Sequence, residues 1–528
     1  MPNYATSLWT DDSEVAPRHP KLTGHRRFDV AIIGAGITGI TATLLLKRMG
    51  KSVAVLESRR VGKGETSKTT AHLTQSLDTR YHSLLDRFGL ETTRLVARSQ
   101  RDAIERIAEF TTELSIPCEF ERLPGYLYAA QRAHAEEIER EADACMRLGM
   151  DVTLMDHAPL PFDTFRTLRF ENQARFQPRR YVLALAERIP GDGCEIFEET
   201  QVLDVEEPDR CRVITEGGVL TADHVIVAAH VPVNDRLRMA TKIPAYRSYA
   251  LAARLPTPDP IGLFWDTEDP YHYIRTHVTQ DGSNMLIVGG SDHKVGQETD
   301  TTRPFEALER YVEGHFGPLP IEQRWSGQII DPLDGLAYIG RNPLSRHVYI
   351  ATGFAGQGMT MGTLAAMILS DRVLGHKNRY AHTYRPSRWA SFASAKKFVM
   401  ENVDFPLHML RDRLRPTRTK PDDLPAGEGA LLVHEGRQLA VYRDHAGALH
   451  ALSPVCPHMG CLVHWNGAEK SWDCPCHGSR FDTRGAVLNG PATRALAPQT
   501  LADDPPQPHA PTNVPAQEQA HPGAHPQR

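Results

Sequence analysis

The sequence predicts an α/β fold built on a parallel sheet, followed by a small domain made only of β-strands. Two glycine-rich turns, each preceded by an apolar run of strand type and followed by a helical stretch, predict the α/β part. From about Asp422 the chain changes to short strand-like runs broken by turns, which predicts the all-β part. A chain of 528 residues is expected to hold two or three domains.

Composition and charge exclude several classes of partner. The net charge of −5 and the ordinary apolar content indicate neither a nucleic acid nor an anionic membrane surface as partner. The longest run without a charged residue, residues 30–46, is shorter than a membrane span and contains three glycines, so no transmembrane segment is expected. Residues 1–27 form a polar, irregular leader without a visible secretory signal. These features favour a cytoplasmic protein.

The first glycine turn has the spacing GxGxxG and follows an apolar run at residues 28–33. A helical stretch at 40–49 and a second strand at 52–57 complete a βαβ unit. The first glycine permits the tight turn, the second lets a pyrophosphate approach, and the third allows the helix to pack on the strand. The predicted dinucleotide-binding residues are Gly34, Gly36, Gly39 and the acid Glu57, which favours FAD or NAD over NADP.

The second glycine turn follows a strand at 348–352 and precedes a helix at about 363–374. Its glycines are Gly353, Gly356 and Gly358. The backbone N–H groups and the helix dipole are expected to converge on an electron-rich group, such as the N1–C2=O edge of a reduced flavin.

The hydroxyl-rich segment 58–74, with Thr69 and Thr70, resembles a loop of the glycine/D-amino-acid oxidase family of flavoproteins. Together with the two turns, the resemblance covers roughly residues 28–376. It implies an α/β FAD-binding Rossmann-type fold with an inserted α+β substrate domain, in which segment 58–74 lies along the FAD and Val202 contacts the adenine. It also implies oxidation of a C–N bond in a small amine or amino-acid-like substrate.

A candidate substrate site lies on the alternating segment 270–275. Tyr271, Tyr273 and Arg275 share one face, on which Arg275 could bind a carboxylate; an ordinary sheet face with a solvated arginine is the alternative. No residue is predicted to be catalytic, because hydride transfer from an amine depends on positioning.

Near the C-terminus, two short loops each offer one thiolate and one imidazole. The candidate ligands are Cys456, His458, Cys474 and His477. In a Rieske [2Fe–2S] centre two thiolates bind one iron and two imidazoles the other. A structural zinc site with the same four ligands is the alternative.

The two loops closely resemble the Rieske signature, including an extra cysteine in each. The resemblance implies a Cys461–Cys476 disulfide, a covering loop at Gly490-Pro491-Ala492, and a Ser479 hydroxyl that donates to a cluster sulfide. Phe481 stands where high-potential relatives carry a tyrosine, which implies a lower potential.

The predicted organisation places the leader at 1–27 and the FAD-dependent oxidoreductase domain at 28–384, with a substrate subdomain at roughly 80–340. Helices are expected at 91–116 and 132–149. A helical segment and linker at 385–421, a Rieske domain at 422–505 and a disordered tail at 506–528 follow.

Together these features predict an FAD-dependent oxidoreductase that passes electrons singly through the cluster to an acceptor. One alternative is a reductase supplying a separate oxygenase, which the missing second nucleotide fingerprint disfavours. The other alternative is a non-catalytic redox-sensing or docking protein.

Overall fold

The computed structural model describes residues 6–11, 18–232, 239, 242–388 and 421–501. The predicted segment at 385–421 lies almost entirely outside this range, and the predicted tail at 506–528 lies entirely outside it. Among the described residues, no helix has both the length and the apolar character needed to cross a membrane.

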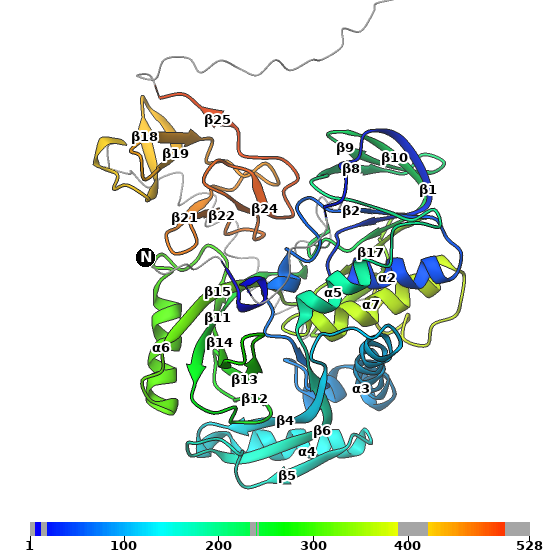
Figure 1. Ribbon diagram of the computed structural model, residues 1–528, viewed down its shortest axis with the longest axis vertical. Helices are drawn as coiled ribbons and strands as arrows, with labels where there is room; N and C mark the ends of the chain where they lie inside the picture. The colour runs from blue at the N-terminus through cyan, green and yellow to red at the C-terminus, as the bar shows by residue number, and fades with distance from the viewer. Residues whose placement is uncertain (1–5, 12–17, 233–238, 240–241, 389–420, 502–528) are drawn as a thin grey trace, which may run out of the picture.

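The first sheet is the predicted nucleotide-binding sheet, with the strand order β16-β17-β10-β1-β2-β7 and with β9 and β8 attached beside β10 (Figure 1). Strands β17, β10, β1, β2 and β7 run parallel. The strands are β1 Gly24–Ile33, β2 Val53–Leu56, β7 Glu195–Phe197, β8 Val202–Glu206, β9 Cys211–Thr215, β10 Gly218–Val227, β16 Tyr338–Arg341 and β17 Val348–Thr352. Helices α2 (Ile37–Arg48) and α7 (Gly358–Val373) pack against each other beside this sheet.

The turn from β1 into α2 and the first turn of α2 each require glycine at one position. Gly34 has a φ of +104°, and a Cβ there would lie 2.5 Å from the carbonyl oxygen of Ala228. A Cβ at Gly39 would lie 1.9 Å from the carbonyl oxygen of Gly34. These close approaches bring the N-terminus of α2 to the carboxyl ends of β1 and β10, where nucleotides bind in such sheets.

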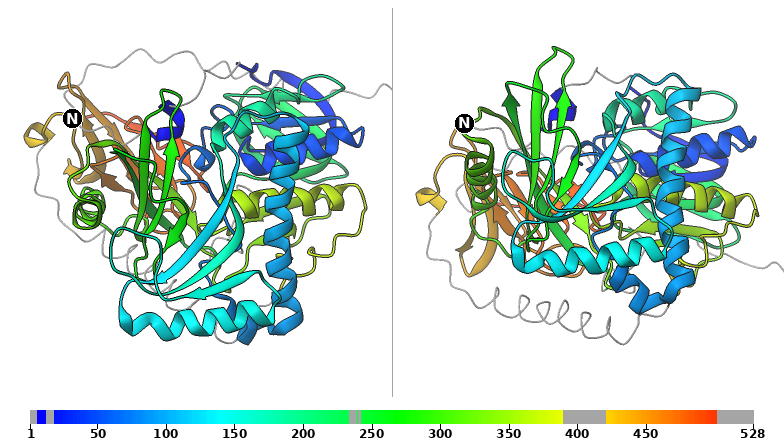
Figure 2. Two further views of the ribbon diagram at one scale, coloured as in Figure 1. Left: turned by 60° about the horizontal axis from the view of Figure 1, so that its bottom comes forward. Right: turned by 90° about the horizontal axis from the view of Figure 1, so that it is seen from below.

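The second sheet has nine strands and forms the inserted part of the fold (Figures 1 and 2). Its strands are β3 His72–Leu73, β4 Glu121–Ala129, β5 Val152–Met155, β6 Phe165–Arg175, β11 Ala245–Leu255, β12 Leu263–Trp265, β13 Tyr273–Val278, β14 Asn284–Lys294 and β15 Ile321–Ile330. Four further helices are α3 Tyr81–Glu113, α4 Ala135–Arg147, α5 Pro178–Ala186 and α6 Arg303–Phe316. Helix α6 packs on β11 and β14, and α4 packs on β6.

Helix α3 begins ten residues earlier than the sequence predicts. Gly89 has a φ of +73° and interrupts the helical dihedral angles, so the first part of α3 is a separate piece joined at a kink. The predicted start at residue 91 is therefore the start of the straight part.

The leader is not irregular throughout, in contrast to the prediction. It contains the short helix α1 (Leu8–Asp11), in which Leu8 and Trp9 are buried. Trp9 donates from its indole nitrogen to the carbonyl oxygen of Thr69, and the Ser7 hydroxyl donates to the carbonyl oxygen of Ser67 at 2.5 Å. The leader thus packs against the hydroxyl-rich segment and hydrogen-bonds to its backbone.

The C-terminal domain consists of two four-stranded antiparallel sheets, coloured yellow to red in Figure 1. One contains β18 Gly429–His434, β19 Arg437–Arg443, β20 Leu449–Leu452 and β25 Pro498–Gln499. The other contains β21 His464–Asn466, β22 Ser471–Asp473, β23 Arg480–Phe481 and β24 Val487–Asn489. The two predicted ligand loops connect β20 to β21 and β22 to β23.

Candidate functional site

One cavity brings together both glycine turns, the hydroxyl-rich segment and a loop of the C-terminal domain. Of the residues predicted to bind FAD, those that line it are Gly34, Gly36, Glu57, Thr69, Thr70, Val202, Gly356 and Gly358. Gly39 and Gly353 are not among the described lining residues. For Gly39 the reason is its predicted role, because it packs α2 against the turn.

Hydrogen bonds hold the cavity wall beside α2 in place. The Glu57 carboxylate accepts from the Ala35 N–H at 2.9 Å and from the Arg59 N–H at 2.9 Å. The Thr66 hydroxyl accepts from the Ile37 N–H in the first turn of α2 at 3.1 Å. One wall of the cavity therefore combines the Glu57 carboxylate, the N-terminus of α2 and the glycine turn. These groups suit a dinucleotide such as FAD.

Tyr271 and Tyr273 line the cavity, but Arg275 does not. Arg275 is 1% exposed, and its guanidinium donates to the backbone carbonyls of Thr70 and Ala71 at 3.1 and 3.0 Å. The same group lies 5.4 Å from the ring centre of Trp9. This geometry does not agree with a carboxylate-binding role for Arg275. Its guanidinium instead hydrogen-bonds to the backbone of the hydroxyl-rich segment.

The structure adds cavity residues that the sequence does not reveal. Among them are His72, Asp78 and Trp265. Asp78 accepts from the Gly356 N–H at 2.7 Å and from the Tyr271 hydroxyl at 3.5 Å. Asp78 and Trp265 belong to no motif, and only the tertiary fold brings them to the cavity, whereas His72 lies within the hydroxyl-rich segment 58–74.

His72 is held as a neutral imidazole. Its Nδ1 lies 3.1 Å from the Thr70 hydroxyl and its Nε2 lies 3.3 Å from the carbonyl oxygen of Ile274. Burial and the nearby charge of Arg275 lower the pKa of His72 to about 3.

The glycine pair at 289–290 on β14 has a structural role. A Cβ at Gly289 would lie 2.1 Å from the ring of Tyr273, and one at Gly290 would lie 2.4 Å from the carbonyl oxygen of Tyr271. The two glycines leave room for the two cavity tyrosines. This packing role explains the glycine pair, and no second nucleotide site is needed to account for it.

The four predicted cluster ligands come together at one end of the C-terminal domain. Cys456 and Cys474 are buried free thiols, and the rings of His458 and His477 lie 5.0 Å apart at 87°. Burial and the proximity of His458 lower the pKa of His477 to about 4, so its imidazole is neutral, as a metal ligand requires. A hydrogen bond from Cys474 and the backbone N–H groups of the first loop hold the pKa of Cys456 below its usual range. The set fits an iron–sulfur cluster.

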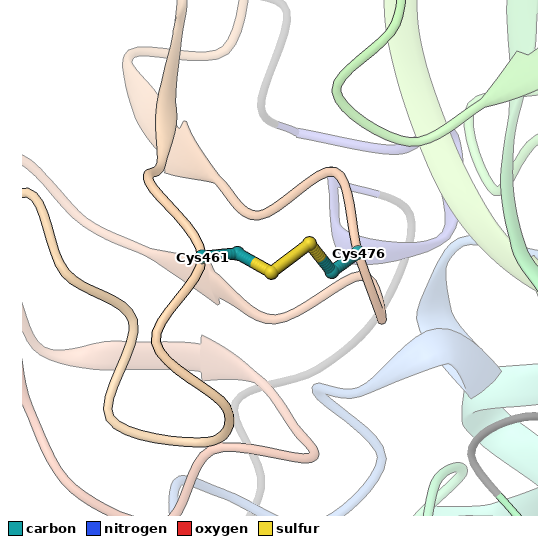
Figure 3. The surroundings of a disulfide bond; sticks show 2 residues. All are labelled: Cys461 and Cys476. Carbon is teal, nitrogen blue, oxygen red and sulfur yellow. A yellow bond between two sulfur atoms is a disulfide. The ribbon is translucent and has the colours of Figure 1, made fainter. Parts of the chain in front are cut away.

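A disulfide joins Cys461 to Cys476 and ties the two ligand loops together (Figure 3). The sulfur of Cys474 lies within 4.8 Å of both disulfide sulfurs. The disulfide therefore lies directly beside the predicted cluster position.

The C-terminal domain contributes to the cavity wall through β24 and the loop that follows it, and its second ligand loop contacts a residue of that wall. Val487, Leu488, Asn489, Gly490 and Ala492 of the C-terminal domain line the cavity. Across the interface, the Gln328 side chain donates to the Gly478 carbonyl oxygen at 2.7 Å, and the Asn489 side chain donates to Glu65 Oε1 at 2.8 Å. Gly478 directly follows the candidate ligand His477.

A buried ion network crosses the same interface. Arg247 of β11 contacts both carboxylate oxygens of Glu469 at 2.5 and 2.7 Å. Arg480 contacts Glu469 at 3.0 Å and Asp473 at 2.9 Å. All four side chains are at most 7% exposed.

Comparison with known proteins shows two families in one chain. The family described as FAD dependent oxidoreductase matches residues 29–372, and the family described as Rieske [2Fe-2S] domain matches residues 417–501. The putative Rieske 2Fe-2S iron-sulfur protein YhfW of Bacillus subtilis (strain 168) is 34% identical over 93% of this chain and 96% of its own length. Gamma-glutamylputrescine oxidoreductase of Escherichia coli (strain K12) is 22% identical over 67% of this chain and 85% of its own.

Among solved structures, glycine oxidase from Geobacillus kaustophilus has a TM-score of 0.60 at 18% identity, over 69% of this chain and 100% of its own. This similarity confirms the predicted fold class. The two family matches confirm FAD and a [2Fe–2S] cluster as the cofactors, and they replace the zinc alternative. The individual residues assigned to each cofactor remain predictions.

The cavity, the cluster loops and the comparisons thus agree: this chain belongs to the FAD-dependent oxidoreductase family and carries a C-terminal Rieske [2Fe–2S] domain.

Proposed function

We propose that the enzyme oxidises a C–N bond of a small amine and delivers the electrons one at a time, through the Rieske cluster, to an acceptor. The observation that carries this proposal is the single cavity lined by both glycine turns and by residues 487–492 of the Rieske domain. The flavin site and the cluster domain thereby meet at one cavity within one chain.

The proposed reaction balances as follows. Oxidation of the amine to an imine removes a hydride from carbon and a proton from nitrogen; FAD can take the hydride, and the cluster can carry its two electrons singly. The acceptor is therefore a one-electron acceptor that is reduced twice in each turnover.

The residues of the cavity favour a positively charged amine without a carboxylate at the reacting end. The cations among the described lining residues are Arg59, two residues from Glu57, and Lys68, whose Nζ lies 3.8 Å from Glu65 Oε1, while Arg275 is held by backbone carbonyls. The Asp78 carboxylate lies beside Gly356 and Tyr271, where it would attract a cation and orient it. Tyr273 and Trp265 add aromatic surface that suits an alkylammonium group.

The printed names of relatives agree with this reaction class. They include an oxidoreductase of gamma-glutamylputrescine, which is an amine, and a glycine oxidase. At these low identities the names support the class of reaction and leave the substrate as part of the proposal.

Anaerobic mixing with candidate amines tests the proposal. An amine should bleach the flavin absorbance, and the electron paramagnetic resonance (EPR) signal of the reduced cluster should follow. Bleaching by NAD(P)H alone would instead identify a reductase that supplies another enzyme. Bleaching by neither would identify a redox-sensing or docking protein.

An Asp78→Asn variant tests the substrate class. We expect the KM for a cationic amine to rise about tenfold, because one charge-assisted contact is lost, with a smaller change for a neutral amine. Asp86→Asn is the matched control, because Asp86 is exposed on α3 and does not line the cavity. A higher rate with the α-carboxylated form of the same amine would contradict the assignment.

A cytoplasmic location is part of the proposal. It is supported by four free, buried thiols outside the cluster loops, which are Cys118, Cys145, Cys194 and Cys211. Cell fractionation with an antibody to the chain tests it.

A further inference from the structure

Strand β14 contains an irregularity beside the cavity. In its ladder with β11, two residues of β14, Ser291 and Asp292, face the single residue Ser248, which is the pattern of a β-bulge. Ser291 has a φ of +54°, a backbone conformation that residues with a side chain rarely adopt. Bulges next to active sites often redirect a side chain. Here the bulge brings Asp292 beside Ser248, and the Ser248 hydroxyl hydrogen-bonds to the Asp292 carboxylate.

The side chain of Ser248 lies on the cavity side of β11. Ser248 and Ala250, two residues apart on this strand, both line the cavity. Tyr249 between them points the other way, where its ring packs against Phe305 of α6. The residue paired with Ser248 on β15 is Gly327, which lines the cavity as well. Strand alternation and pairing therefore place the Ser248 hydroxyl on the face of the sheet that the cavity occupies.

A second hydroxyl extends this contact. The Tyr273 hydroxyl lies 2.8 Å from the Ser248 hydroxyl, and both residues line the cavity. An ionised carboxylate can only accept, so Ser248 donates its one hydrogen to Asp292 and accepts the hydrogen of Tyr273. Tyr273, Ser248 and Asp292 thus form a directed line of hydrogen bonds, the relay. It begins at two lining residues and ends at an acid that is not among the described lining residues.

The charge on Asp292 changes near neutral pH. Burial of the carboxyl group and the nearby charges of Asp78 and Asp269 raise the pKa of Asp292 to about 7, although the serine hydrogen bond opposes the rise. The other titratable groups that act on it are Tyr271 and Tyr273, and burial raises the pKa of both phenols well above the usual range, so both are neutral. A base whose pKa lies near the working pH is suited to proton transfer.

We propose that Asp292 is the proton acceptor for amine oxidation and that the Tyr273 and Ser248 hydroxyls carry the proton to it. The substrate ammonium gives one N–H proton to the Tyr273 oxygen, while the Tyr273 proton passes to Ser248 and the Ser248 proton to Asp292. Each hydroxyl loses one O–H bond and gains one, the carboxylate ends protonated, and no electron is transferred in this step. The neutral amine has the free lone pair that loss of hydride from carbon requires. The inference rests on the proposed function and adds the residues that remove the proton.

Two measurements on the full-length protein, loaded with FAD and the cluster, test the relay. The first is infrared difference spectroscopy of carboxyl groups during a pH titration without substrate. We expect a band of a protonated carboxyl group with a midpoint near pH 7, and this band should be absent in Asp292→Asn. In Ser248→Ala the midpoint should rise, because the variant loses the hydrogen bond that stabilises the carboxylate.

The second measurement is the rate of flavin bleaching by a saturating amine, followed anaerobically as a function of pH. In the wild type the rate at pH 6 should be about tenfold below the plateau at high pH, because little of Asp292 is then ionised. In Asp292→Asn the plateau should fall about a hundredfold and this pH dependence should disappear. Ser248→Ala and Tyr273→Phe keep the acid but break the relay, so both should lose the same pH dependence.

Asp281→Asn is the matched control. Asp281 is exposed in the turn between β13 and β14 and is not among the described lining residues, so this variant should keep the wild-type rate and pH profile. If Asp292→Asn fails to fold, Ser248→Ala and Tyr273→Phe decide, because neither changes the number of charges.

The inference is overturned if Asp292→Asn, or both hydroxyl variants, keep the wild-type rate and pH profile. It is also overturned if no carboxyl band that depends on Asp292 titrates near pH 7. A flavin that no amine bleaches would overturn the proposed function together with the relay. Bleaching with an unchanged pH profile would overturn the relay alone, so the two failures are distinguishable.

Discussion

Phe481 is a position at which we expect a single hydroxyl to change the potential of the cluster. Its ring is fully buried in the core that also contains Cys456 and Cys474. We predict that Phe481→Tyr raises the midpoint potential of the cluster, because a hydroxyl there would donate to the sulfur atoms and stabilise the reduced state. A redox titration followed by EPR measures the change.

Ser479→Ala is the complementary variant, for which we expect a lower midpoint potential of the cluster. The Ser479 hydroxyl is buried and lies within hydrogen-bonding reach of the Cys456 thiol. Its loss should lower the potential. Equal potentials in wild type and both variants would show that neither position contacts the cluster.

At the residue scale, sequence reasoning is most specific where chemistry is encoded by local spacing. The four candidate cluster ligands occur in two short loops, and two of the three glycines of the first turn line the cavity, while their roles stay predictions. The prediction for Arg275 does not hold. Strand alternation predicts on which side of a sheet a side chain lies, but it cannot show that the guanidinium already donates to backbone carbonyls. Asp78 lies in no motif, and its place depends on contacts with Gly356, distant in sequence.

At the scale of elements, the turn between β1 and α2 gives a sharp prediction. Gly34→Ala should abolish FAD retention, because the added Cβ would meet a backbone carbonyl that cannot move aside and because φ is +104°. The flavin content of purified protein measures this. Gly314→Ala is the matched control: this glycine lies in α6 with nothing within 4 Å of its added Cβ, and the change should stabilise by up to about 1 kcal/mol.

The disulfide between the ligand loops gives the second prediction at this scale. Replacing Cys461 and Cys476 by serine should destabilise the Rieske domain by about 3 kcal/mol, as expected for a closed loop of 15 residues. Denaturant unfolding followed by cluster absorbance measures the loss. Each single replacement should cost about as much as the double one, since either breaks the bond, and additive effects would contradict this account.

Element boundaries depend on interactions that a sequence pattern does not contain. Strand β17 matches the predicted 348–352 because an apolar run is bounded by the glycine turn. Helix α3 begins before its predicted start because Gly89 permits a kink that breaks the helical period. Helix α1 was missed because four residues carry no periodic signal, and Trp9 is fixed by tertiary contacts with Thr69 and Arg275.

At the scale of the whole molecule, the two domains are joined by buried charges rather than by an apolar surface alone. Arg247 and Glu469 are 222 residues apart in sequence, so no local pattern could pair them. Buried ion pairs give little net stability compared with apolar packing. We expect this network to fix the geometry of the interface between the two domains, because a displaced arrangement would leave a charge without its partner.

Glu469 provides the test of that interface. Although burial opposes ionisation, Arg247 and Arg480 hold the pKa of Glu469 at about 2, below its usual range. We predict that Glu469→Gln destabilises the docked protein by about 3 to 5 kcal/mol at neutral pH, because two arginines lose their shared partner. Denaturant unfolding followed by cluster absorbance measures the change.

The pH dependence distinguishes lost charge from lost packing. A carboxyl group with a lowered folded-state pKa stabilises fully above its unfolded pKa of about 4.3, and the contribution is lost as the pH falls towards 2. The difference in stability between wild type and Glu469→Gln should therefore shrink over this window. Glu322→Gln, at the exposed ion pair with Arg254, is the control and should cost at most about 1 kcal/mol. If the Glu469 difference stayed constant from neutral pH to pH 2, the interface would depend on packing, and the buried charges would not be what holds the two domains in place.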